Sequence, residues 1–227
     1  VMKPAWLKID LTSKRSTGET AGILAKHHLN TICTSGLCPN RSECWMARTA
    51  TLMIGGDICT RKCRFCNTLS GRPRLLNPDE PRRVAESVKA LKLRYAVITS
   101  VDRDDLPDYG AAHWIKTIEE IRRLNPDTKI ELLIPDFMGK ADLIRQVMAT
   151  HPHVAGHNME TVRRLTPSVR SVARYERSLE VLREIANCGI TAKTGFMLGL
   201  GETHDDLIAT MDDILSRGSQ RLTLRPY

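Results

Sequence analysis

Six of the seven cysteines lie between residues 33 and 66 and form two groups of three. The groups are Cys33, Cys38 and Cys44, and then Cys59, Cys63 and Cys66. An odd total, with no secretory signal at the start of the chain, argues against a framework of disulfide bonds. Such close spacing favours metal binding by thiolates, while Cys188 stands apart and is interpreted as an inert buried thiol.

The second group, within "CTRKCRFC", offers three thiolates where a zinc site usually has four protein ligands. Iron–sulfur clusters are held by Cys thiolates, and three cysteines leave one iron of a [4Fe–4S] cluster without a protein ligand. A catalytic metal centre keeps such an open position for its substrate or cosubstrate. A structural zinc loop, completed by a fourth ligand from elsewhere in the chain, is the alternative.

After residue 50, short apolar runs alternate with helical patterns. Six runs are typical of strands buried on both faces, at 51–57, 95–101, 129–135, 153–159, 191–198 and 221–224. Amphipathic patterns between them predict helices at 79–92, 110–125, 175–189 and 203–218. Alternating strands and helices favour a parallel sheet, in which functional residues gather at the carboxyl ends of the strands.

The sequence therefore predicts an α/β fold, and specifically a partial (βα)6 TIM-like barrel with an N-terminal cysteine-bearing extension. An open doubly wound sheet is the alternative. The barrel is favoured because the polar residues follow several different strands rather than one switch point. Residues 1–50 lack the strand–helix rhythm and are expected to form the extension, and residues 51–227 the barrel.

Charge and composition argue against a nucleic-acid-binding protein and against a membrane-spanning one. The formal net charge is +8, but aromatic residues make up only 4% of the chain, which leaves little material for stacking nucleic-acid bases. A basic surface that meets an acidic protein is at least as plausible as nucleic-acid binding. No apolar run approaches the roughly 20 residues of a membrane span, so the expected location is the cytoplasm or an organelle matrix.

"CTRKCRFC" resembles the C-x3-C-x-aromatic-C signature of the radical S-adenosylmethionine (radical SAM) enzymes, with Phe65 as the aromatic residue. The resemblance implies a [4Fe–4S] cluster on Cys59, Cys63 and Cys66 whose open iron binds S-adenosylmethionine (SAM). Reductive cleavage of SAM would give a 5′-deoxyadenosyl radical that removes hydrogen from an unactivated carbon.

The first group, "CTSGLCPNRSEC", makes the resemblance narrower. Together the two groups resemble the lipoyl synthase family, whose auxiliary [4Fe–4S] cluster is held by an N-terminal C-x4-C-x5-C. The similarity continues through "KPAWLK", "SVDRDDLPD", "ELLIPDF", "HNMET" and "GLGET" and covers nearly the whole chain. It implies that Cys33, Cys38 and Cys44 hold the auxiliary cluster, which acts as the sulfur donor.

The family resemblance also implies a reaction and partners. Two sulfur atoms would be inserted at C6 and C8 of an octanoyl group on a lysine of a carrier domain. The expected carriers are the acyltransferase subunits of 2-oxo-acid dehydrogenases and the glycine-cleavage carrier protein, and ferredoxin or flavodoxin is an expected electron donor. The protein is expected to be a monomer that binds neither nucleic acid nor membrane.

Contacts to SAM are assigned by the same resemblance to residues in or directly after the predicted strands. Ser100, Arg103 and Asp104, after the second predicted strand, would bind the cosubstrate or close the mouth of the barrel. Asn158 and Glu160 would contact its ribose and amino group, and Lys193 its carboxylate. His157 is interpreted more readily as a packed residue at a strand end.

One part of the family pattern is missing. Lipoyl synthases carry an arginine–serine motif near the C-terminus, whose serine is the fourth ligand of the auxiliary cluster, and "RLTLRPY" contains no such motif. We therefore expect the C-terminal portion of the barrel domain to be missing, and the serine ligand is assigned to no residue. A different radical SAM sulfur-inserting enzyme and a zinc-stabilised binding module are the competing interpretations.

Overall fold

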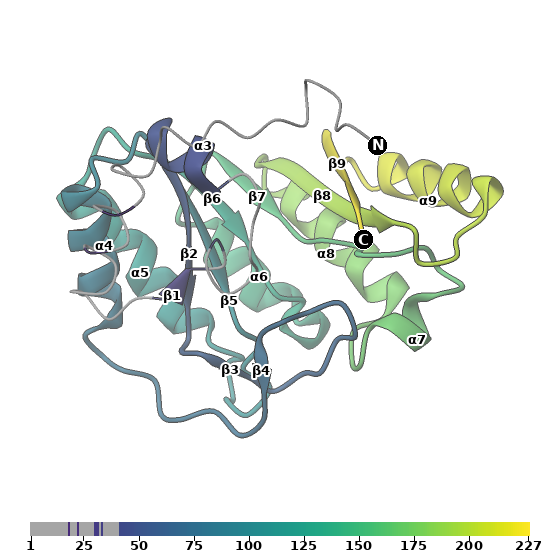
Figure 1. Ribbon diagram of the computed structural model, residues 1–227, viewed down its shortest axis with the longest axis horizontal. Coiled ribbons are helices and arrows are strands. Elements are labelled where there is room, and N and C mark those ends of the chain that lie inside the picture. The colour runs from purple at the N-terminus through teal and green to yellow at the C-terminus, as the bar shows by residue number, and fades with distance from the viewer. Residues whose placement is uncertain (1–17, 19–21, 23–29, 32, 34–40) are drawn as a thin grey trace, which may run out of the picture.

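The computed structural model describes residues 18, 22, 30, 31, 33 and 41–227, which form an α/β fold around a seven-stranded sheet (Figure 1). The strand order is β1-β2-β5-β6-β7-β8-β9, parallel from β2 to β9, with β1 antiparallel to β2. These strands are β1 (Asn30–Thr31), β2 (Thr49–Ile54), β5 (Tyr95–Ser100), β6 (Lys129–Leu133), β7 (Val154–Gly156), β8 (Thr191–Leu198) and β9 (Arg221–Pro226).

Helices cover one face of this sheet and lie behind it in Figure 1, because each crossover between parallel strands is helical. The covering helices, each packed on the next, are α4 (Glu80–Ala90), α5 (Ala111–Leu124), α6 (Ala141–Met148) and α8 (Tyr175–Asn187). Further helices are α3 (Arg41–Met46), η3 (Phe137–Gly139), α7 (Thr166–Val169) and α9 (His204–Ser216). No helix of the described part of the chain has the length and apolar character needed to span a membrane.

The two faces of the sheet differ in chemistry. Side chains alternate along each strand, and those that face the helices, such as Ile98 and Leu132, are fully buried in one apolar core. The opposite face carries polar side chains, including Tyr95, Glu131 and Lys193, which contact one another from β5, β6 and β8. We call the face away from these helices the inner face, and it is polar enough to hold a ligand. The face that packs on the helices, the outer face, stabilises the fold through its buried apolar side chains.

The predicted fold class is confirmed, and strands lie at all six predicted positions. The structure adds α6, which the sequence analysis did not identify, and a separate pair of short parallel strands, β3 (Ile58–Cys59) and β4 (Leu69–Ser70). β2 begins at Thr49, so the domain boundary predicted after residue 50 falls inside a strand. Much of residues 1–50 lies outside the described residues, and the division into an extension and a barrel stays a prediction.

Candidate metal centre

The second cysteine group lies at the carboxyl ends of the strands. Cys59 ends β3, which follows β2 after a turn through Gly55 and Gly56, both with positive φ. Cys63 and Cys66 follow in the loop that leads to β4, at the lower end of the molecule in Figure 1. We call residues 59–66 the cysteine loop.

The sulfur of Cys59 is surrounded by hydrogen-bonding groups. It accepts the backbone N–H groups of Arg61 and Asp102 at 3.4 and 3.3 Å, and its thiol is 3.7 Å from the Asp102 carboxylate. Burial, followed by the negative charge of Asp102, raises the pKa of the Cys59 thiol to about 11. Because a coordinating metal removes the thiol proton outright, the two N–H donors suit a metal-bound thiolate.

The rest of the cysteine loop is fixed to the end of α7 and to the residues just after it. The backbone N–H of Lys62 donates to the Ser171 hydroxyl at 3.0 Å, and that of Arg64 donates to the Val169 carbonyl at 2.9 Å. The Cys63 sulfur is 4.0 Å from the Ser171 oxygen. Cys66 is exposed, so the outer side of the loop faces solvent.

Arg61, between the first two cysteines, is the buried anchor of this loop. Its guanidinium donates two hydrogen bonds to Asp104, at 2.7 and 2.8 Å, and one to Asp136 at 2.6 Å. It also forms a salt bridge with Asp102 at 3.4 Å. Arg177 of α8 reaches Asp136 from the other side at 3.1 Å. The loop is thereby connected to the ends of β5 and β6 and to the helical layer.

Charge balance in this network sets the pKa values of its carboxyl groups. Burial alone would raise the pKa of Asp136, but the hydrogen bond and positive charge of Arg61 outweigh it and hold that pKa well below its ordinary value. For Asp102 the effect of burial prevails over Arg61, and its pKa rises to about 6. The carboxylates of Asp102, Asp104 and Asp136 together outweigh the burial of Arg61 and raise the pKa of its guanidinium above the ordinary value.

Arg170 is a second buried arginine close to the cysteines. One of its terminal nitrogens donates to the Ser178 hydroxyl and to the Met159 carbonyl, while its Nε has no partner among the described residues. Its charge acts on Cys63 and on Glu160. Burial lowers the pKa of Arg170, so a neighbouring anion would be favoured by both hydrogen bonding and charge.

Asn158 and Glu160, two of the predicted SAM contacts, are brought together after β7. The Asn158 side chain hydrogen-bonds Glu160 and packs against Gly195 of β8. Glu160 has φ of 63°, a left-handed conformation that costs free energy and recurs at functional sites. Burial raises the pKa of Glu160, opposed by the charge of Arg170.

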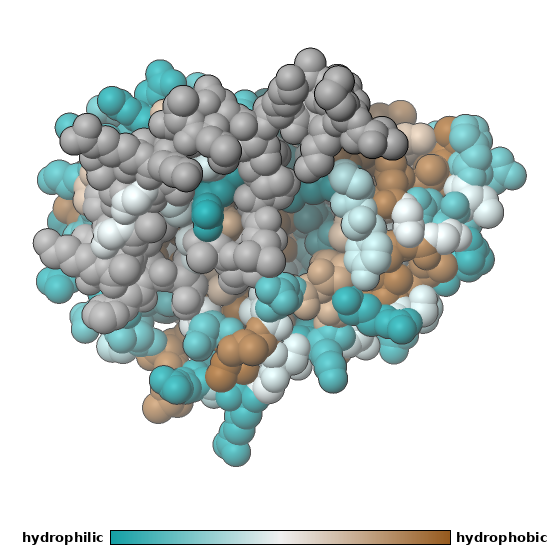
Figure 2. Space-filling view, viewed as in Figure 1, coloured by the Kyte–Doolittle hydropathy of each residue, from teal (hydrophilic) through white to brown (hydrophobic). Residues whose placement is uncertain are grey.

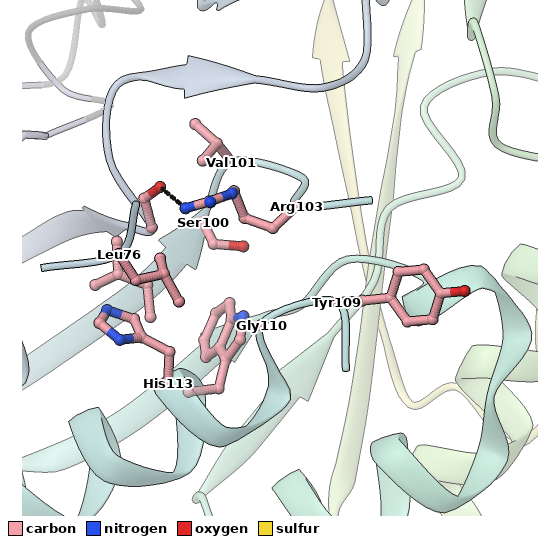
Figure 3. A pocket seen from close by; sticks show the side chains of 10 residues that line it. Leu76, Ser100, Val101, Arg103, Tyr109, Gly110 and His113 are labelled. Atoms are coloured by element: carbon pink, nitrogen blue, oxygen red, sulfur yellow. Dashed lines mark hydrogen bonds between the residues drawn. The ribbon is translucent and has the colours of Figure 1, made fainter. Parts of the chain in front are cut away.

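Two of the predicted SAM contacts near the end of β5, Arg103 and Asp104, already form hydrogen bonds and ion pairs with other residues of the protein. Asp104 accepts from Arg61, and Arg103 is buried, with a bidentate pair to Asp105 at 2.8 Å. Arg103 also donates to the Gly55 carbonyl at 3.1 Å (Figure 3). Ser100 lines a small pocket beside Arg103, and its hydroxyl has no partner among the described residues. Contact with SAM stays a prediction for all three predicted residues.

Lys193 is already paired. Its Nζ is 2.6 Å from one oxygen of Glu131, and the other oxygen accepts the Tyr95 hydroxyl at 2.6 Å. Glu131 thus connects β5, β6 and β8 across the inner face of the sheet. The carboxylate of SAM would have to compete with Glu131 for Lys193, and this contact too stays a prediction.

The first cysteine group is only partly within the described residues, because Cys38 lies outside them. Cys33 is buried and Cys44, on α3, packs partly buried against the same apolar core. Cys59 belongs to a different cluster, with Met53 and Val101. Of the described cysteines, Cys33 and Cys44 thus belong to one apolar cluster and Cys59 to another.

The cysteine loop fits a thiolate-held cluster by its chemistry. Among the described residues, no three His, Cys, Asp or Glu side chains are gathered closely enough to hold a metal ion. Three cysteines on one short loop, two N–H donors at the Cys59 sulfur and the unpaired Nε of Arg170 are nevertheless suited to an anionic iron–sulfur group.

Comparison with known proteins identifies the family. A family model of the radical SAM superfamily matches residues 53–214. The chain is 60% identical over 228 residues to lipoyl synthase of Porphyromonas gingivalis, covering 100% of this chain and 81% of the relative. The chain belongs to the lipoyl synthase family. Lipoyl synthases of Bacteroides fragilis and Treponema denticola are 58% and 51% identical, over 100% and 99% of this chain and 79% and 78% of theirs.

Solved structures extend the comparison to the fold. Methylornithine synthase has a TM-score of 0.62 at 11% identity, over 95% of this chain and 67% of its own. Streptococcus suis SuiB bound to S-adenosylmethionine has a TM-score of 0.58 at 13% identity, over 83% and 42%. These likenesses show a shared architecture. Membership of the lipoyl synthase family confirms the predicted enzyme class and its cofactors, [4Fe–4S] clusters and SAM.

Arg61 and Arg170 were not identified as site residues from the sequence. Arg61 lies between the first two cysteines of the motif, at a position that the motif leaves open. A basic residue inside the motif, together with three acids after two successive strands, was the signal that could have found it. Arg170 follows the short helix α7, and no feature of the sequence near it indicates a buried arginine.

Proposed function

We propose that the two cysteine groups divide the work of a lipoyl synthase in this protein. Cys59, Cys63 and Cys66 would hold the cluster that binds SAM, and Cys33, Cys38 and Cys44 the cluster that donates sulfur. The observation that carries the proposal is the placement of the cysteine loop at the carboxyl ends of the parallel strands, anchored by Arg61. When bound there, a [4Fe–4S] cluster with an open iron supplies the electron that cleaves SAM.

The residues of the chain would orient the cosubstrate at this edge of the sheet. Asn158 and Glu160 offer an amide and a carboxylate to its ribose and amino groups. Arg170 offers a buried positive charge beside Cys63, and it becomes a further candidate contact for an anionic group. Arg170 is fixed by its hydrogen bonds to Ser178 and Met159, and Asn158 is bonded to Glu160, which limits the motion that a bound cosubstrate would have to suppress.

The predicted substrate is an octanoyl group on a lipoyl carrier protein. Hydrogen would be removed at C6 and C8, and one sulfur atom inserted at each carbon. The carriers we propose are lipoyl domains of 2-oxo-acid dehydrogenase acyltransferase subunits and the glycine-cleavage carrier protein. Ferredoxin or flavodoxin would deliver electrons one at a time.

Single cysteine variants test the division of work. We would measure 5′-deoxyadenosine and thiolated octanoyl peptide by mass spectrometry for Cys59→Ala, Cys44→Ala and the control Cys188→Ala. Cys59→Ala should form neither product, because one cluster ligand is lost. Cys44→Ala should form 5′-deoxyadenosine without thiolated peptide, and Cys188→Ala should form both.

Two outcomes would overturn the assignment. Undiminished 5′-deoxyadenosine from Cys59→Ala would remove the SAM-binding cluster from the cysteine loop. Thiolated peptide from Cys44→Ala would remove the sulfur donor from the first cysteine group.

A further inference from the structure

A strongly basic segment begins within the cysteine loop. Residues 58–78 contain five basic residues and no acidic one. Arg61 is buried, and the other four are exposed: Lys62, Arg64, Arg72 and Arg74. None of these four forms a salt bridge with a residue that the structure describes. We call residues 62–76 the basic rim.

Two exposed arginines on the opposite side of the same edge are held in salt bridges, whereas the cations of the basic rim form none with a described residue. After β7, the exposed Arg163 pairs with Glu176 and with Asp213. Arg164 pairs with Asp206 at 2.8 Å. These two arginines are neutralised by neighbours, whereas the four exposed cations of the basic rim lie in a stretch, residues 58–78, that contains no acidic residue.

Two leucines of the basic rim are exposed to solvent. Leu69 has 66% of its surface exposed, and Leu75 has 94%. The surface over β3, β4 and the link to α4 shows hydrophobic and hydrophilic patches side by side, at the lower end of the molecule in Figure 2. Apolar side chains among polar ones are typical of a surface that binds another protein.

The basic rim is held in place before any partner binds. The backbone N–H of Gly71 donates to the Cys59 carbonyl at 2.9 Å, and the Ser70 hydroxyl donates to the Arg61 carbonyl at 3.0 Å. Further along, the buried Arg103 donates to the Arg74 carbonyl at 3.0 Å. Such fixation lowers the entropic cost of association.

We propose that the basic rim docks the carrier protein, through an acidic surface that surrounds its octanoylated lysine. The inference rests on the proposed function, because it requires an acylated lysine that enters the inner face of the sheet. A carrier whose lysine enters at the carboxyl ends of the strands must lay its own surface against the loops there. Among those loops, the basic rim combines two exposed leucines with four exposed cations that form no salt bridge with a described residue.

Other acidic partners are less well suited to this surface. Phosphate binding would use the cations but not the leucines, and the only aromatic residue of the rim is Phe65, so bases have little to stack on. An electron donor needs only a small, transient contact. A carrier whose acylated lysine has to be held in position during the reaction is better served by apolar anchors beside the charges.

Direct binding tests the proposal. The dissociation constant of an octanoylated carrier domain would be measured by calorimetry at low and at high salt, for the wild type and for Arg72→Gln/Arg74→Gln/Leu75→Ser. We expect the variant to bind roughly tenfold more weakly at low salt, with a smaller dependence on salt. The control, Lys89→Gln/Arg94→Gln, removes two exposed cations near the opposite ends of the strands and should bind like the wild type.

A second measurement separates this proposal from the proposed function. Turnover of a short octanoyl-lysine peptide by the wild type reports the activity alone, and its absence would refute the function rather than the docking. For the variant, kcat/KM for the carrier should fall about tenfold relative to that for the peptide. All three substituted side chains are exposed, so the triple variant should fold like the wild type. The single variant Leu75→Ser, which changes the more exposed of the two leucines, serves as a second test that leaves the apolar core unchanged.

Two results would overturn the docking proposal. One is a variant that binds the carrier as tightly as the control does. The other is a variant that binds the carrier like the wild type but whose iron–sulfur cluster is reduced more slowly by flavodoxin. That result would identify the basic rim as the docking surface of the electron donor.

Discussion

Arg61 donates a hydrogen bond of 2.6 Å to Asp136, a carboxylate with no exposed surface at the end of β6. A residue inside the cysteine motif is thus joined to a strand 75 positions away in the chain. Asp104 and Asp102 complete its surroundings from the end of β5. The position of the cysteine loop therefore depends on buried charges as well as on its own backbone.

Replacement of Arg61 should destabilise the protein strongly. Arg61→Met leaves Asp104 and Asp136 without their main partner, and breaking a buried ion pair from one side costs about 3–5 kcal/mol. Lys62→Met, at the exposed neighbouring position, should change the free energy of unfolding by less than about 0.5 kcal/mol. Urea denaturation of both variants measures the difference. Equal stabilities would show that the network does not anchor the loop.

His157 should make stability depend on pH. Its ring is buried between the Ile134 carbonyl and the Ser178 hydroxyl, at 2.9 Å each. Burial, followed by the charge of Arg170, lowers its pKa from 6.5 to about 4. Since the unfolded state takes up the proton first, the stabilisation is complete above pH 6.5 and is lost as the pH falls toward 4. The loss between pH 7 and pH 5 is about 2 kcal/mol.

The variant His157→Gln isolates this effect from other titrating groups. Urea denaturation at pH 7 and pH 5 should show a smaller loss of stability in the variant than in the wild type. Asp102, whose raised pKa acts in the opposite direction, contributes equally to both proteins and cancels in the comparison. Identical pH dependence in the two proteins would contradict the burial of a neutral His157.

Lys193 and Glu131 should be energetically coupled. Each single variant, Lys193→Met or Glu131→Gln, breaks the 2.6 Å ion pair on the inner face of the sheet. The double variant removes both charges, and a coupling free energy of about 1–2 kcal/mol is expected from the cycle. SAM affinity of the same variants tests the predicted contact, which Glu131→Gln should strengthen by releasing Lys193. No coupling in the cycle would contradict the observed pairing.

The strands and main helices could be predicted because their signals are local. Apolar runs predicted the strands. Two predicted helix ranges end at residues with capping chemistry: Thr203, at the start of 203–218, forms a capping box, and Gly189, at the end of 175–189, has φ of 74°. α6 was missed because its eight residues form too short an apolar pattern to stand out beside η3. His157 was interpreted correctly as a packed residue.

Much of the site could not be predicted, because it depends on contacts between distant segments. The pairing of β3 with β4, which positions the basic rim, involves two residues in each strand and leaves almost no pattern in the sequence. Arg103 and Lys193 were recognised as residues at the right edge or face of the sheet. Their partners, the Gly55 carbonyl and Glu131, are set by tertiary packing.

We propose that this chain holds two [4Fe–4S] clusters, one on each cysteine group, and metal analysis tests this proposal most directly. Iron and sulfide would be counted in anaerobically purified wild type and in Cys59→Ala/Cys63→Ala/Cys66→Ala. We predict about eight of each per wild-type chain and about four per variant chain. Zinc without sulfide in the wild type, or an unchanged count in the variant, would contradict the account.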